Sequence, residues 1–221
     1  MTSRTASIDG VVAKISEARR LIPAARGVLV AISGIDGSGK GYVAGKIVEA
    51  LRAKGLRVAE INIDGWLNLP HIRFTKENPA EHFYRHAIRF DALFAQLVLP
   101  LRDRRSIHIA VDVAEETATE YRRHTYNFQE TEVIVLEGIY LLKRELRAHY
   151  DLSFWIDCSF DTALARALAR RQEGLSANET IAAYRTTYFP AQELHFARDD
   201  PKAGATAIVN NDGPSHGMSA V

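Results

Sequence analysis

The chain has 221 residues, of which 47% are hydrophobic and 25% are charged, as is ordinary for a globular protein with a sizeable core. Its 28 Lys and Arg residues against 27 Asp and Glu residues leave a formal net charge of +1, which predicts neither a nucleic-acid partner nor an anionic membrane surface. The single cysteine, Cys158, excludes an intrachain disulfide and fits the reducing environment of the cytoplasm. No apolar run approaches the length of a transmembrane helix.

Helical and β-rich patterns alternate along the chain. In chain order they predict a helix over residues 8–21, a strand over 28–33, a helix over 41–54, a strand over 56–63, a loop over 67–78, a helix over 79–99, strands over 107–113, 120–128 and 132–136, a helix over 139–149, a strand over 152–157, helices over 162–172 and 178–189, and a strand over 205–209. The strands over 107–113 and 120–128 are expected to pair as a ribbon.

This alternation predicts an α/β fold in which helices cover both faces of a parallel sheet. Ligands of such sheets bind beyond the carboxyl ends of the strands. Polar residues that follow the predicted strands are therefore the site candidates: the loop after Ser33, then Asp64, Glu137, Cys158 and Asn210. Because Cys158 ends an apolar run, a buried core thiol is the simpler interpretation of this residue.

The most informative segment is GIDGSGKG at residues 34–41, between a predicted strand and a predicted helix. It contains the phosphate-loop pattern G-x-x-x-x-G-K, in which glycines let backbone N–H groups form an anion nest and Lys40 reaches the outer phosphates. The helix N-terminus adds positive partial charge. We predict that these residues bind the phosphates of ATP or GTP. The predicted nucleotide-binding residues here are Gly34, Asp36, Gly37, Ser38, Gly39, Lys40, Gly41 and Tyr42.

Gly41 stands where a Ser or Thr hydroxyl normally coordinates magnesium in this pattern. A water molecule can replace that hydroxyl, since magnesium commonly keeps several waters. Asp64 and Glu137 would then hold more of the metal. Asp64 can also accept the proton of an incoming hydroxyl, although an Asp before Gly65 is also common in plain turns. Glu137 can alternatively cap the following helix.

Arginines after the strand at residues 152–157 can stabilise the transferring phosphoryl group. Arg170 is the first candidate and Arg166 the second, with Arg171 beside them, and the alternative is a solvated basic helix face. Acceptor binding is predicted for residues between the second strand and Glu137. They are Asp64, His71, Arg73, Tyr84, Arg85, Tyr126 and Phe128, with Arg122 and His124 in the same mixture of basic and aromatic residues. The cationic members His71, Arg73 and Arg85 would suit an acceptor that already carries a phosphate or carboxylate.

These motifs resemble the uridine kinase and phosphoribulokinase group of P-loop kinases. The resemblance rests on GIDGSGKG, on Asp64, on LEGIY at residues 136–140, on the Arg-rich helix after Asp157 and on YFPAQELHF at residues 188–196, and it spans roughly residues 28–212. It implies a three-layer αβα sandwich with a five-stranded parallel core sheet in the order 2-3-1-4-5. It also implies a single domain, with an N-terminal helix within 1–26, an acceptor-side insertion at 65–130, and a lid with its following helix at 161–196.

The resemblance implies phosphorylation of a small-molecule hydroxyl, with ATP or GTP as donor and magnesium as cofactor. In this group Lys40 would bind phosphates, Asp64 would be the base, Glu137 would assist magnesium, and Arg170 or its neighbours would close the lid. Backbone near Asn210 and Asn211 would lie by the nucleotide base. A nucleoside of the uridine type is the first acceptor, and a sugar phosphate or another metabolite alcohol is the alternative.

Two departures from the group's pattern bear on this expectation. One is Gly41, which suggests a second hypothesis from another class: a nucleotide-binding protein without kinase turnover. The other follows Tyr126-Asn127-Phe128, where uridine kinases continue into a nucleoside-binding His-Ser-Arg element and this chain continues with Gln129-Glu130. An NTPase that drives conformational change in a partner would normally show a larger chain or a basic face. The sequence leaves the oligomeric state open, with a homo-oligomer as one outcome.

Overall fold

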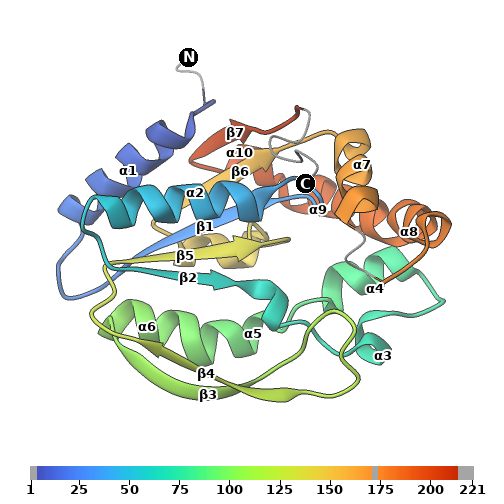
Figure 1. Cartoon of the computed structure of the whole chain (residues 1–221), viewed down its shortest axis with the longest axis horizontal. Helices are drawn as coiled ribbons and strands as arrows, with labels where there is room; N and C mark the ends of the chain where they lie inside the picture. The colour runs from blue at the N-terminus through green and yellow to red at the C-terminus, as the bar shows by residue number, and fades with distance from the viewer. Residues whose placement is uncertain (1–3, 171–173, 214–221) are drawn as a thin grey trace, which may run out of the picture.

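The computed structural model describes residues 4–170 and 174–213, and it contains a five-stranded sheet in the order β2-β5-β1-β6-β7. The sheet strands are β1 (Val28–Gly34), β2 (Val58–Asn62), β5 (Val133–Gly138), β6 (Leu152–Asp157) and β7 (Ala207–Asn210). Each pairs with its neighbours in parallel. Counted without the ribbon strands, this is the predicted order 2-3-1-4-5, and the predicted fold class is confirmed (Figure 1).

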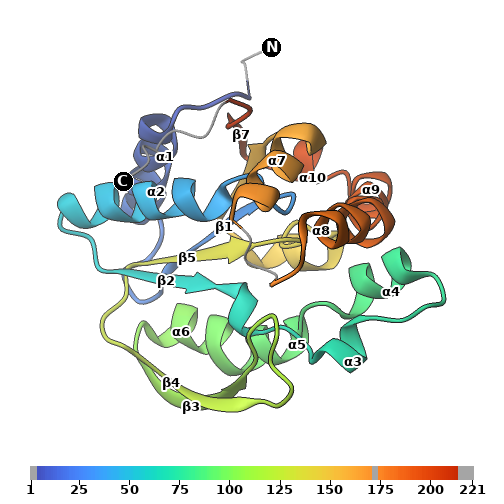
Figure 2. The same cartoon turned by 45° about the vertical axis from the view of Figure 1, so that its right-hand side comes forward.

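Helices cover both faces of the sheet, as Figures 1 and 2 show. On one face lie α1 (Ile8–Leu21) and α2 (Lys40–Ala53), which pack on every second residue of β1, namely Val28, Val30 and Ile32. The alternate residues Leu29 and Ala31 belong to the second core on the other face. Because β1 is buried along its whole length, its sequence reads as an apolar run rather than an alternating one.

The predicted helix over residues 79–99 is wrong as a single element. Helix α4 (Pro79–His86) ends where the chain bridges back to the segment after β2: the N–H of Asn68 donates to the Ala87 carbonyl, at 3.0 Å, and the N–H of Arg89 donates to the Trp66 carbonyl, at 2.9 Å. The helix then restarts as α5 (Phe90–Leu93), passes through a π-helical turn (Phe94–Val98) and continues as α6 (Leu99–Arg104). These long-range bonds replace the helical ones and break the predicted helix.

Other helices differ in their bounds. The predicted loop over 67–78 contains the short helix α3 (Pro70–Arg73), and residues 139–149 form a turn followed by a 3₁₀ helix (Arg144–His149). Helix α7 (Phe160–Arg170) is found where predicted, and residues 171–172 of that prediction lie outside the described residues. Helix α8 (Ala177–Ala183) is capped by Ser176. It runs through a π turn (Tyr184–Tyr188) into α9 (Phe189–Asp199), and α10 (Pro201–Gly204) follows.

The predicted ribbon is confirmed as an antiparallel pair, β3 (Ile107–Val113) with β4 (Arg122–Phe128). It lies on the outer side of α5 and α6 (Figure 2), and its residues Val111 and Val113 join the core on that face. The turn between the two strands points toward the carboxyl ends of β2 and β5 in both views. The ribbon can therefore supply side chains to a site at that edge of the sheet.

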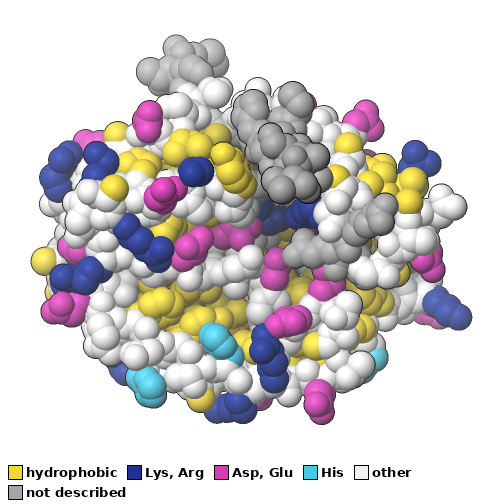
Figure 3. All heavy atoms as spheres, in the orientation of Figure 1, with side chains coloured by type: hydrophobic (Ala, Val, Ile, Leu, Met, Phe, Trp, Pro, Cys, Tyr) yellow, Lys and Arg dark blue, Asp and Glu magenta, His cyan; other side chains and the backbone are white. Residues whose placement is uncertain are grey.

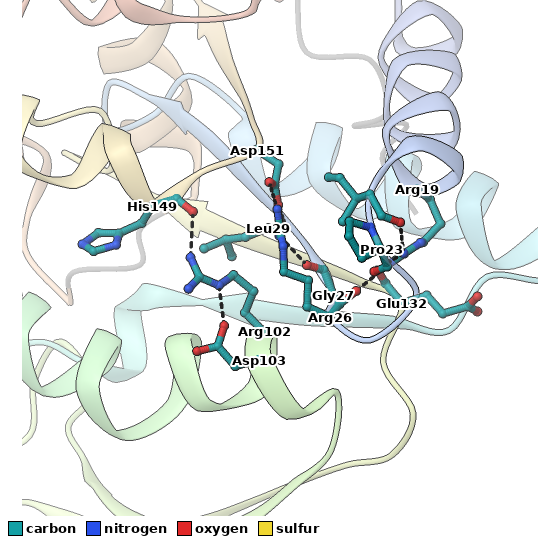
Figure 4. A network of polar contacts seen from close by, with 11 residues as sticks. Arg19, Pro23, Arg26, Gly27, Leu29, Arg102, Asp103, Glu132, His149 and Asp151 are labelled. Carbon is teal, nitrogen blue, oxygen red and sulfur yellow. Dashed lines mark hydrogen bonds and ion pairs between the residues drawn. The ribbon is translucent and has the colours of Figure 1, made fainter.

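The opposite end of the sheet is closed by ion pairs and backbone contacts (Figure 4). Arg26 donates two hydrogen bonds to the Asp151 carboxylate, at 2.7 and 2.8 Å, and the same carboxylate accepts the N–H of Leu29 at 2.8 Å.

Cys158 is half-buried rather than the predicted core thiol, and its Sγ lies 3.6 Å from Arg166 Nη1. None of the helices in the described ranges combines the length and apolarity needed to cross a bilayer.

Candidate active site

A cavity of about 780 Å³ lies at the carboxyl ends of β1, β2 and β5. Figure 3 shows this face of the molecule hollowed near its centre, with acidic and basic side chains gathered around the hollow. The phosphate loop and α2 line one side of the cavity, and α3, the ribbon turn, α7 and α9 contribute the remaining walls. The site therefore joins the predicted nucleotide residues to part of the predicted acceptor region.

The phosphate loop needs its glycines for conformation and for space. Gly37 and Gly39 have φ of +76° and +78°, in the left-handed region that favours glycine. A Cβ on Gly37 would lie 2.5 Å from the Ala163 carbonyl oxygen of α7, and one on Gly34 would lie 2.7 Å from the Ile156 carbonyl oxygen. The loop is thus pressed against β6 and α7, which leaves its other side open to the cavity.

Two side chains support the loop from behind. The Ser38 carbonyl accepts hydrogen bonds from Arg166 Nη1, at 3.1 Å, and from Asn211 Nδ2, at 2.7 Å. Arg166 also donates to the carbonyls of Asn211 and Gly213, at 2.8 and 2.7 Å. Arg166 therefore holds the loop against the segment after β7 and does not line the cavity. Asn211 was named beside Asn210 in the prediction for the nucleotide base, and here it supports the loop, whereas Asn210 is exposed and accepts the Asp212 N–H.

Lys40, Asp64 and Glu137 converge at the cavity floor. Lys40 is the first residue of α2, and Glu137 lies near the end of β5 opposite Asn62 of β2. Strand β2 ends at Asn62, and Asp64 follows in a 3₁₀ turn (Ile63–Gly65) where its N–H donates to Asn62 Oδ1 at 2.7 Å. The strand predicted over residues 56–63 therefore ends one residue early, at Asn62, and Asp64 lies in the turn that follows it.

Glu137 is 5% exposed, whereas Asp64 is an exposed residue whose side chain lines the same cavity. Desolvation raises the pKa of Glu137 to about 7, against the opposing effect of the Lys40 ammonium. Desolvation also raises the pKa of Asp64, again opposed by Lys40. A carboxylate with a raised pKa accepts a proton more readily than an ordinary one, which suits Asp64 to general-base chemistry.

Residues 34–41, Asp64 and Glu137 fit a magnesium nucleotide. A Cβ on Gly41 would lie 3.7 Å from Glu137 Oε2, so position 41 faces this carboxylate directly. Residues 4–170 and 174–213 hold no cluster of three or more His, Cys, Asp or Glu side chains arranged to bind a metal. Phosphate oxygens and waters would therefore supply most magnesium ligands, with Glu137 and Asp64 as the protein's contribution, which is the usual arrangement in nucleotide sites.

Arg170 lines the cavity from the end of α7, with its Nη2 3.9 Å from Asp36 Oδ1 in the phosphate loop. Tyr184 also donates its hydroxyl hydrogen bond to Asp36. Asp36 thus connects the loop to α7 and to the π turn (Tyr184–Tyr188) that follows α8. The sequence indicated Arg170 and Asp36, whereas Tyr184 was missed because nothing in its local pattern indicates a contact with residues 148 positions earlier.

Of the predicted acceptor residues, Asp64, Arg73 and Tyr126 line the cavity. Trp66 Nε1 donates to the Tyr126 hydroxyl at 3.3 Å, which orients the phenol ring. Arg122 and His124, from the same predicted acceptor region, also line the cavity. The cavity further receives residues that the acceptor prediction did not select: Glu115, Glu116, Thr117, Tyr188 and Gln192. The ribbon turn explains several of these, because it folds over the carboxyl edge of the sheet.

The other predicted acceptor residues lie elsewhere. Tyr84 donates its hydroxyl hydrogen bond to Asp199, at 2.6 Å, and Arg85 pairs with Glu81, at 2.5 Å; both line a separate shallow recess. His71 is exposed on α3 outside the cavity, and Phe128 stacks on Tyr126 with ring centroids 6.0 Å apart.

Two further predicted residues belong to other sets. Tyr42, predicted to bind the nucleotide, lines the cavity with a largely exposed ring. Arg171 lies outside the described residues.

Known proteins are similar to this chain in sequence and in architecture. Residues 29–188 match the sequence profile of the phosphoribulokinase/uridine kinase family. A uridine kinase from Limosilactobacillus reuteri is 32% identical over 193 residues, which cover 85% of each chain. A uridine kinase from Macrococcus caseolyticus is 28% identical over 197 residues, 86% of this chain and 91% of the relative. A solved structure described as a possible uridine kinase from Bacillus stearothermophilus has a TM-score of 0.71 at 20% identity, over 91% of this chain and 96% of the other.

Proposed function

Because this chain belongs to the phosphoribulokinase/uridine kinase family, we propose that it is a kinase that transfers the γ-phosphate of Mg-ATP to a hydroxyl of a small molecule, with nucleosides as the first acceptor class to test. The observation that carries the proposal is the convergence of Lys40, Asp64 and Glu137 at one cavity floor beside the glycine loop. Phosphate-binding, proton-accepting and metal-holding groups are the parts that phosphoryl transfer requires.

The residues divide the work in this proposal. Backbone N–H groups of the loop and the Lys40 ammonium bind the triphosphate, and magnesium, when bound, neutralises charge on its outer oxygens. The acceptor hydroxyl approaches Asp64, its oxygen bonds to the γ-phosphorus, and the bond from that phosphorus to the bridging oxygen breaks. The hydroxyl proton passes to Asp64 and ADP leaves. Arg170 lies where its guanidinium can stabilise the transferring phosphoryl group.

Release of ADP from Mg-ATP, measured against a panel of nucleosides, sugar phosphates and other metabolite alcohols, tests the proposal. An acceptor that stimulates release is expected to lose its effect in Asp64→Asn by about 10²- to 10⁴-fold, while ATP binding is kept. Lys40→Ala is expected to lose ATP binding itself. If Asp64→Asn turned over at the parent rate, Asp64 would not be the base. GTP in place of ATP distinguishes the donor.

One observation favours a second candidate, a nucleotide-binding protein without turnover. Gly41 supplies no hydroxyl beside Glu137. The loop therefore offers magnesium one protein ligand fewer than loops with the usual Ser or Thr at this position. This candidate predicts nucleotide binding that depends weakly on magnesium and no acceptor-stimulated release of ADP. Activity in Gly41→Ser but not in the parent would establish it.

A further inference from the structure

Two buried polar groups in the cavity wall have no partner within the described chain. Arg73, at the end of α3, is 2% exposed and its Nε makes no hydrogen bond. Gln192, on α9, is 1% exposed and its Oε1 makes none either. Both side chains line the same cavity as Asp64. Buried polar groups are nearly always satisfied, so an unpartnered pair in a cavity wall points to a ligand.

The Arg73 guanidinium also lacks a close counter-charge. Among the described residues, no carboxylate makes an ion pair with Arg73. Its Nη2 donates to the backbone carbonyl of Glu116, and its Cζ lies 5.1 Å from the centroid of the Phe74 ring. Several less buried arginines do have such partners: Arg26 pairs with Asp151 and Arg122 with Glu115. A buried charge is costly unless it is paired, and Arg73 is the one buried arginine among the described residues.

Burial has the electrostatic effect expected for this position. Desolvation lowers the pKa of Arg73, and the nearby carboxylates of Glu116 and Asp64 oppose that effect without cancelling it. Arg73 nevertheless stays protonated at neutral pH, because free arginine has so high a pKa. A bound anion would therefore make the direct ion pair that no described carboxylate makes with this guanidinium.

We propose that the acceptor carries a phosphate or carboxylate group that binds Arg73, in addition to the hydroxyl that faces Asp64, and that a donor group of the same molecule binds Gln192. This deepens the proposed kinase function and rests on it. Of the three cations that the sequence indicated for an anionic acceptor, only Arg73 lines the cavity. Sugar phosphates, hydroxy acids and nucleotides have this chemistry and a free nucleoside does not, so this inference selects anionic acceptors over the nucleosides that the proposed function tests first.

Matched pairs of acceptors isolate the anionic group: uridine against uridine monophosphate, ribose against ribose 5-phosphate, and glycerol against glycerate. Release of ADP from Mg-ATP gives kcat/KM for each member. We expect the charged member of at least one pair to exceed its neutral partner by about tenfold or more, the factor of one charge-assisted hydrogen bond. Phosphate and carboxylate are distinguished by which pair responds. A neutral member that is used as well as its charged partner in every active pair would overturn the proposal.

Arg73→Gln tests the residue itself. We expect it to reduce kcat/KM for the charged acceptor about tenfold or more through KM, with the ATP Kd unchanged, and Arg73→Lys to recover part of the loss. Arg57→Gln is the matched control, since Arg57 is exposed and pairs with Glu130 away from the cavity. A fall for charged and neutral acceptors alike, or a changed ATP Kd, would show that Arg73 only supports the fold.

A binding measurement separates this inference from the kinase function. Thermal unfolding is followed with a non-hydrolysable ATP analogue and each acceptor, so that no turnover is needed. We expect a charged acceptor to raise the Tm of the parent and of Arg57→Gln but not of Arg73→Gln. If no acceptor stimulates ADP release, the kinase function fails, yet this shift still supports the anion site. Equal shifts in the parent and in Arg73→Gln would overturn it.

Discussion

A side-chain carbon on Gly41 would lie 3.7 Å from Glu137 Oε2, an ordinary van der Waals distance. Gly41 belongs to the first turn of α2, and Glu137 lies near the end of β5. A hydroxyl at position 41 would therefore fit between the loop and Glu137 without moving backbone. Steric crowding is not the reason for a glycine here, and the missing hydroxyl can be restored by a single substitution.

We predict that Gly41→Ser strengthens the use of magnesium. The added hydroxyl supplies one further oxygen beside Glu137, which is expected to lower the magnesium concentration for half-maximal ADP release by about tenfold, the effect of roughly 1.4 kcal/mol. The measurement is a magnesium titration at saturating ATP and acceptor. Gly45→Ser is the control, because Gly45 lies on the same helix with no atom within 4 Å of its would-be Cβ. An identical titration for parent and Gly41→Ser would mean that water already fills the position.

Gly37→Ala is predicted to damage ATP binding directly. Its φ of +76° disfavours a side chain, and the new carbon would lie 2.5 Å from the Ala163 carbonyl oxygen, so that the loop must move. We expect an ATP Kd at least about tenfold higher by calorimetry, the result of a loss of roughly 1.4 kcal/mol or more. Gly55→Ala is the control that separates backbone strain from the steric clash with Ala163. Gly55 also has a positive φ, +82°, but no atom lies within 4 Å of its would-be Cβ. That variant should lose about 1 kcal/mol of stability and keep its ATP Kd.

Asp36→Asn is predicted to tighten ATP binding. The carboxylate lies in the phosphate loop, where it repels a triphosphate and faces Arg170 at 3.9 Å. An Asn keeps an acceptor for the Tyr184 hydroxyl and removes the charge. We expect a decrease in ATP Kd of up to about fivefold at low salt that shrinks as salt rises, since partly exposed pairs are worth about 0–1 kcal/mol. Asp103→Asn removes the same charge at the far end of the sheet as a control (Figure 4). Weaker ATP binding in Asp36→Asn would contradict the prediction.

Local patterns were enough to predict the conformation of the glycine loop and Lys40 at one wall of the cavity, and nucleotide binding there stays a prediction. The strand, the glycines and Lys40 are neighbours in sequence, so their geometry follows from short-range rules. Asp64 and Glu137 were found by a topological rule, because carboxyl ends of parallel strands meet at one edge. The sheet order followed from the family resemblance, and the structure confirms it.

The acceptor half depends on long-range packing that the sequence does not display. Arg73 and Arg85 have similar surroundings in the sequence, yet α3 turns one into the cavity while α4 carries the other to a separate recess. The bridge between Leu67 and Ile88 breaks a helix that periodicity alone made continuous. Arg166 and Arg170 lie one turn apart on α7, and only their tertiary contacts separate a loop support from a cavity residue.

The buried cluster of Tyr84, His195 and Asp199 provides a prediction about acid stability. Burial alone would raise the pKa of Asp199, but hydrogen bonds from His195, Tyr84 and the N–H of Arg144 lower it to about 2. Burial lowers the pKa of the His195 imidazole, against the opposing effect of Asp199. The folded protein therefore binds fewer protons than the unfolded chain at both groups. Their contribution to the free energy of unfolding is complete at neutral pH, falls below about pH 6.5 through His195, and falls again between about pH 4 and 2 through Asp199.

Tyr84→Phe removes one hydrogen-bond donor to Asp199. The pKa of the Asp199 carboxyl in the folded state should therefore rise. We predict a free energy of unfolding about 1 kcal/mol lower at pH 7, with a smaller further loss between pH 4 and 3 than in the parent, as measured by urea denaturation at a series of pH values. Tyr121→Phe is the matched control, since its hydroxyl donates to the neutral amide of Asn68 at 3.2 Å and should leave the pH dependence unchanged. Because Tyr84 lies outside the cavity, its variant should also keep the parent KM for every acceptor. An unchanged acid slope, or a raised acceptor KM, would show that the Tyr84 hydroxyl does not serve chiefly to stabilise the Asp199 carboxylate.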